Sequence, residues 1–110
     1  MYVVCKFSYT CKGFRYRVVK KETLREARVS ALSFLFRFPV RHQWEFGEEV
    51  NYYFIEDWAD IAILGIEEDV CKIMKISEEQ EDKYEVVEGI WAYNHNSDNK
   101  YIVIIFREVA

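Results

Sequence analysis

Residues 101–106 read Tyr-Ile-Val-Ile-Ile-Phe, the longest strongly apolar run in a chain of 110 residues. A strand with one face in solvent alternates apolar and polar side chains, whereas a strand covered on both faces is apolar throughout. The run is also too short to cross a membrane as a helix, which needs about 18 residues or more. Residues 101–106 therefore predict a buried strand at the centre of a sheet.

The residues around this run extend the sheet. Residues 84–94 and 101–109 are predicted to form a hairpin across the polar loop 95–100. Aromatic side chains make up 17% of the chain, and Val and Ile far outnumber Leu. These residue types suit a pleated, half-buried surface, so the composition favours a sheet-dominated fold.

A second hairpin is predicted over residues 2–20, with Lys12 and Gly13 as its two-residue loop. In this register Tyr9 faces Tyr16, and one face of the hairpin is aromatic and apolar. A slip by one residue would exchange the two faces, so the clean pattern supports the assignment of faces. The opposite face is basic and rich in hydroxyls, and it carries Lys6, Ser8, Thr10, Arg15 and Arg17.

The clearest helix signal follows at residues 23–38. Thr23 and Glu26 fit a capping box, and Pro39 is expected to stop the helix. Its polar arc is narrow and consists of Glu26, Ser30, Ser33 and Arg37. A helix lying on one sheet needs only one apolar stripe, and this helix has more than a stripe. The surplus apolar positions are the expected contacts of a homodimer or larger homo-oligomer, namely Val29, Leu32 and Phe36.

The middle of the chain gives weaker signals. We expect strands at 43–46, 50–55 and 60–66, while 67–76 has helical spacing as well as strand alternation and is assigned weakly to a strand. The prediction is an α+β fold in which an antiparallel sheet of about five or six strands packs against one main helix, in the order β-β-α-β-β-β-β with the fifth strand left open. Residues 1–110 are expected to form a single domain.

Charge is strongly segregated along the chain. Residues 1–42 carry a net charge of +8 and residues 43–110 a net charge of −12, which gives −4 overall. Three consequences are open: the halves attract each other within one domain, protomers associate head to tail, or the basic half meets an anionic ligand. The first consequence needs no partner at all.

The basic hairpin face is the best candidate for a binding site. Arginine forks and hydroxyl groups are the usual partners of phosphate. An isoelectric point of about 5.2 disfavours duplex nucleic acid, so a short anionic ligand or an acidic protein surface is the expected partner. The candidate anion-binding residues are Lys6, Lys12, Arg15 and Arg17.

Other kinds of site have little support in the sequence. His42 and His95 are isolated, no Cys/His pair has metal-ligand spacing, and the four glycines are dispersed, so we expect no metal and no cofactor. The three cysteines show no C-x-x-C spacing. Reduced thiols, together with the lack of a signal-peptide pattern or a membrane span, predict a cytoplasmic protein without a membrane partner.

Three functional hypotheses follow. The first is a small, acidic, non-enzymatic protein that self-associates and binds other proteins, of the kind that viruses and mobile elements often encode. The second is an anion-binding module that takes a nucleotide or a nucleic acid on the basic hairpin. The third is an enzyme of unrecognised type, for which no residue constellation rises above chance.

Overall fold

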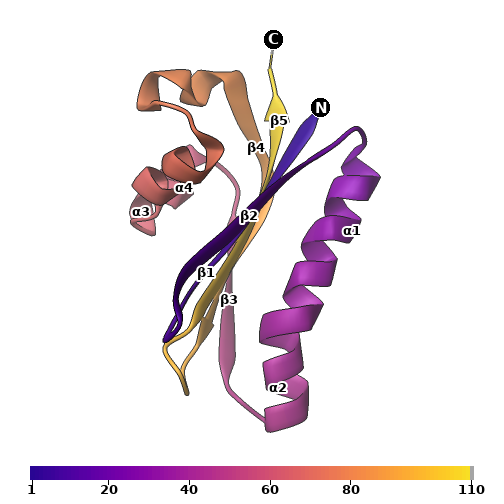
Figure 1. The fold of residues 1–110 in the computed structure, drawn as a ribbon, viewed down its shortest axis with the longest axis vertical. Coiled ribbons are helices and arrows are strands. Elements are labelled where there is room, and N and C mark those ends of the chain that lie inside the picture. The colour runs from indigo at the N-terminus through magenta and orange to yellow at the C-terminus, as the bar shows by residue number, and fades with distance from the viewer. Residues whose placement is uncertain (110) are drawn as a thin grey trace.

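Strand β5 lies at the centre of a five-stranded antiparallel sheet with the order β2-β1-β5-β4-β3 (Figure 1). The fold is seen in a computed structural model that describes residues 1–109. The strands are β1 (Tyr2–Thr10), β2 (Gly13–Lys21), β3 (Val50–Ile55), β4 (Tyr84–Asn94) and β5 (Lys100–Glu108). The helices are α1 (Leu24–Leu35), α2 (Arg41–Phe46), α3 (Trp58–Ile63) and α4 (Glu67–Met74), with a π turn at Phe36–Val40 and a 3₁₀ helix at Glu78–Lys83.

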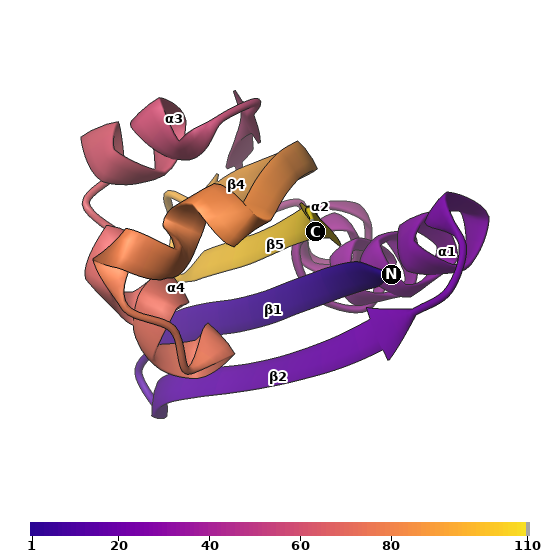
Figure 2. The same ribbon diagram turned by 90° about the horizontal axis from the view of Figure 1, so that it is seen from above.

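Helices cover both faces of the sheet. Figure 2 shows α1 and α2 on one side and α3 and α4 on the other. The six side chains of residues 101–106 are at most 4% exposed, which confirms the predicted buried central strand. They alternate between two apolar cores: Ile102, Ile104 and Phe106 join the side chains of α3 and α4, and Tyr101, Val103 and Ile105 join those of α1.

The long helix does not stop at Pro39, and the strand expected at 43–46 does not form. Helix α1, the π turn and α2 form one continuous helix of 23 residues. A proline removes one backbone N–H and crowds the carbonyl four residues before it, which normally breaks an α-helix. Here Pro39 lies buried inside the π turn, whose wider winding accommodates the ring. The helix ends instead at Gly47, which adopts the left-handed conformation with φ 63°.

The strands expected at 60–66 and 67–76 are helices. Asp57 caps α3, since its carboxylate accepts a hydrogen bond from the Asp60 N–H at 2.9 Å. Three acidic residues occupy the first turn of α4, where the helix dipole favours negative charge. The helical spacing of Val70 and Ile73 is therefore the pattern that the structure follows in residues 67–74, and both side chains are buried against the sheet. The α+β class is confirmed with five strands, in the order β-β-α-β-(α)-β-β.

The first hairpin has the predicted faces but a register shifted by two residues. Thr10 pairs with Gly13 and Tyr9 with Phe14, so Cys11 and Lys12 form the turn. Gly13 has φ 98°, so the positive φ falls on the first residue of β2 rather than inside the two-residue loop. A shift of two keeps every side chain on its own face. The basic face of the hairpin is therefore as predicted.

Within residues 1–109, no helix is both long and apolar enough to cross a bilayer.

We expect Ile104→Ala to destabilise the protein by about 2–5 kcal/mol, because it opens a cavity in the fully buried central strand. The matched control is Ile63→Ala, which removes the same atoms from a side chain that is 82% exposed and should change stability by less than about 0.5 kcal/mol. Urea unfolding followed by circular dichroism measures both. Equal effects of the two substitutions would contradict the central position of β5.

Candidate anion-binding groove

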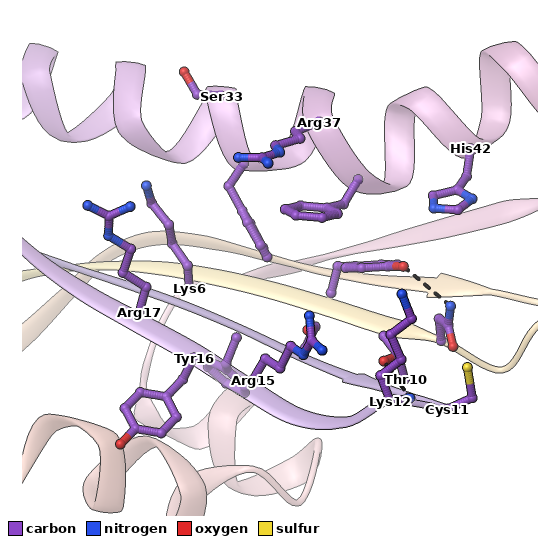
Figure 3. A pocket seen from close by; sticks show the side chains of 16 residues that line it. Lys6, Thr10, Cys11, Lys12, Arg15, Tyr16, Arg17, Ser33, Arg37 and His42 are labelled. Carbon is purple, nitrogen blue, oxygen red and sulfur yellow. Dashed lines mark hydrogen bonds between the residues drawn. The ribbon is translucent and has the colours of Figure 1, made fainter.

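A groove of about 540 Å³ opens between the long helix and the hairpin of β1 and β2 (Figure 3). It exists because α1 packs mainly over β1 and β5, while the edge strand β2 extends beyond the helix. The uncovered strip of sheet carries the basic hairpin face. We call this space the groove from here on.

All four predicted anion-binding residues line the groove. Lys6 and Arg17 are cross-strand partners, and both side chains point toward α1 in Figure 3. Arg15 stands opposite Ser8, nearer the turn that carries Lys12. The Thr10 hydroxyl oxygen accepts a hydrogen bond from the Lys12 backbone N–H at 3.1 Å, which fixes this turn.

The helix supplies a second wall that the sequence analysis did not assign to the site. Arg37 and His42 face the groove from the π turn and α2 (Figure 3), and Ser33 of α1 also belongs to its lining. Ser33 and Arg37 belong to the narrow polar arc seen in the sequence. The sequence places Arg37 on this arc but does not show which side of the helix meets the hairpin, so it held no signal that assigns Arg37 to the groove.

Aromatic rings form the base of the groove beside these cations. Phe38 stacks on Tyr101 with ring centroids 5.7 Å apart and an angle of 12° between the rings. His42 stacks on the same tyrosine at 6.2 Å. The Arg37 guanidinium carbon lies 5.5 Å from the centre of the Phe38 ring, a cation–π distance. The groove therefore offers flat apolar surface together with positive charge.

The Lys and Arg side chains of the groove have no carboxylate partner within residues 1–109, whereas the His42 ring lies 3.2 Å from the Glu48 carboxylate. The ion pairs in this part of the chain use Lys20, Arg28, Arg41, His42 and Arg107. No Asp or Glu lines the groove either. Attraction between the basic and acidic halves of the chain therefore does not account for Lys6, Lys12, Arg15, Arg17 or Arg37.

The pKa of Lys6 is lowered by its burial and by nearby positive charges. Its half-buried position lowers the pKa of its ammonium group, and the neighbouring charges of Arg17 and Lys21 lower this pKa further. A bound anion would act in the opposite direction by favouring the charged form of Lys6.

The three candidate self-association residues lie on the outer side of the long helix. Val29, Leu32 and Phe36 are 59%, 50% and 61% exposed, so neither the sheet nor another layer of the same chain covers them. The wide apolar arc read from the sequence is thus left open to solvent in the single chain.

The remaining chemistry-bearing side chains are dispersed or inert. Within the described residues, no three His, Cys, Asp or Glu side chains gather as metal ligands would. The Cys71 thiol is buried and hydrogen-bonds Glu81, and burial is the larger reason that its pKa rises to about 12. Burial also raises the pKa of Cys5. Neither thiol is activated as a nucleophile, because the thiolate is the reactive form.

Comparison of this chain with protein-family models, with curated proteins and with solved structures finds no match.

We expect iodoacetamide to alkylate Cys11 alone in the native protein. Cys11 is exposed at the rim of the groove, whereas Cys5 and Cys71 are buried. Mass spectrometry of tryptic peptides after a short exposure at neutral pH measures the labelling, with denatured protein as the reference in which all three thiols react. Rapid native labelling of Cys5 would show that the packing of β1 is wrong.

Proposed function

We propose that this protein is a non-enzymatic binding protein whose groove takes a phosphate-bearing ligand. The observation that supports this proposal best is the convergence of five cations, without a carboxylate, on one groove. Unpaired like charges held side by side disfavour the free protein, and a polyanion relieves that repulsion.

The chemistry of the lining favours phosphate over a single carboxylate. Three of the five cations are arginines, whose planar forks donate two parallel hydrogen bonds to phosphate oxygens. Ser8 and Thr10 add neutral hydroxyl groups of the kind that also contact phosphates. The aromatic base suits the flat ring of a nucleobase.

We expect the double substitution Arg15→Ala and Arg17→Ala to weaken the binding of fluorescein-labelled dT10 at least 100-fold. Each charge-assisted contact contributes about 1.5–3 kcal/mol, so the loss of two contacts costs at least about 3 kcal/mol, which is more than 100-fold in affinity. Fluorescence anisotropy titration measures the affinity, and binding of the unaltered protein should weaken steeply with added salt. Bound dT10 should also slow the alkylation of Cys11 at the groove rim.

The matched control is Arg28→Ala with Arg107→Ala, which changes the net charge equally at two arginines paired with Glu88 and Glu85 outside the groove. It should leave the affinity within about twofold of the unaltered protein. The groove variant should keep its melting temperature, because exposed charges contribute little to stability. The proposal fails if both variants bind equally, or if dT10, ATP and inorganic phosphate all fail to bind.

A second candidate function, self-association, is favoured by the exposed apolar side chains of the long helix. Contiguous apolar surface on a small protein is typical of an interaction site. We expect the protein to behave as a homodimer or larger at micromolar concentration, and Leu32→Glu with Phe36→Glu to dissociate it. Size-exclusion chromatography with light scattering measures the mass, and a monomeric mass for the unaltered protein would rule this candidate out.

A further inference from the structure

The groove continues into a second hollow of about 470 Å³ along the same helix. Lys6 and Ser33 line both spaces, so the two hollows meet at these side chains. The second hollow adds Lys21 from the end of β2 and Arg25 from the start of α1. Neither residue takes part in an ion pair within residues 1–109.

The two hollows together form a basic track between β2 and the long helix. It runs from Lys12 and Arg15, past Arg17 and Lys6, to Lys21 and Arg25. Arg37 faces it from the helix, and Glu26 is the one acidic residue along its length in the described chain. The seven cations are thus spread along the track rather than gathered around one point.

Both walls of the track have the same length. Lys21 lies six positions after Arg15 on β2, which corresponds to about 20 Å at the rise of a strand. Twelve residues of the helix separate Arg25 from Arg37, which corresponds to about 18 Å. One phosphate group fills a small part of this distance. At about 3.4 Å per nucleotide in a stacked strand, the track accommodates about six phosphates, and fewer in an extended strand.

We propose that the ligand of the track is a single-stranded nucleic acid, bound over about four to six nucleotides. This inference rests on the proposed function and specifies its ligand class. The phosphates would lie along the cations, and bases would stack near Phe38, which is 36% exposed beside Tyr101.

Two other polyanions fit the track less well. An acidic peptide would satisfy the cations but would leave the aromatic base of the groove unused. A duplex would bring a second charged strand toward a molecule whose residues 43–110 carry a net charge of −12. Single-stranded nucleic acid uses both the charge and the rings.

The test is a length series of fluorescein-labelled dT2, dT4, dT6 and dT10, titrated by anisotropy at fixed salt. Affinity should rise at least tenfold from dT2 to dT6 and then change less than threefold to dT10. The variant Lys21→Gln with Arg25→Gln should weaken dT6 at least tenfold while leaving dT2 within twofold. Arg15→Gln with Arg17→Gln should weaken every oligomer.

The control variant is Lys20→Gln with Arg28→Gln. It removes the same residue types from the same two elements, but both side chains are paired with acids outside the track. It should match the unaltered protein for every oligomer.

The outcomes separate the two proposals. Equal affinity for dT2 and dT6 would overturn the track and leave a groove for a short phosphate ligand. Tight binding of a hexaglutamate peptide without binding of dT6, or equal binding of a 10-base-pair duplex and dT10, would overturn the choice of single-stranded nucleic acid. Failure of every oligonucleotide, of ATP and of inorganic phosphate would overturn the proposed function itself.

Discussion

The need to bury β5 on both faces is the constraint on which the rest of the structure depends. Its six central side chains alternate between two apolar cores, so each face of the sheet must carry a helical layer. The long helix supplies one layer, and α3 and α4 supply the other. Tyr9, which donates a hydrogen bond to Asp69 of α4, and Trp58, whose Nε1–H donates to the Tyr84 carbonyl at 2.8 Å, fasten the second layer to the sheet.

This arrangement also explains why the groove lies where it does. A single helix placed over the centre of a five-stranded sheet cannot cover an edge strand as well. On the β2 side the exposed strip holds arginine and lysine side chains, which tolerate solvent, and the helix faces them with Arg37. The groove therefore follows from the width of the sheet and from the basic side chains on its uncovered strip.

The sequence predicts those parts of the fold that depend on periodicity. The central strand, the faces of the first hairpin and the start of the long helix at Thr23 all follow from patterns within a few residues. The hairpin register was wrong by two residues because both registers place the same side chains on the same face. The prediction that the helix stops at Pro39 was wrong because a π turn, which has no simple sequence signature, keeps the helix continuous. The short segments from Trp58 to Met74 bury only a few side chains each, so strand and helix patterns could not be told apart without the capping contacts of Asp57.

Four of the cations that line the groove could be chosen from the sequence, because Lys6, Arg15 and Arg17 share one face of the hairpin and Lys12 lies at its end. Arg37 could not, since its approach to the hairpin depends on how the helix crosses the sheet.

The half-buried position of Lys6 beside Arg17 and Lys21 has a thermodynamic consequence for the whole molecule. Burial and the two neighbouring charges disfavour the charged form of Lys6 in the ligand-free fold. Any ligand that binds only the folded state returns free energy to it, about 2.7 kcal/mol at a free concentration one hundred times the dissociation constant. If the proposed ligand binds the groove, the melting temperature of this chain would rise with the ligand concentration, and the ligand-free protein would be its least stable folded form.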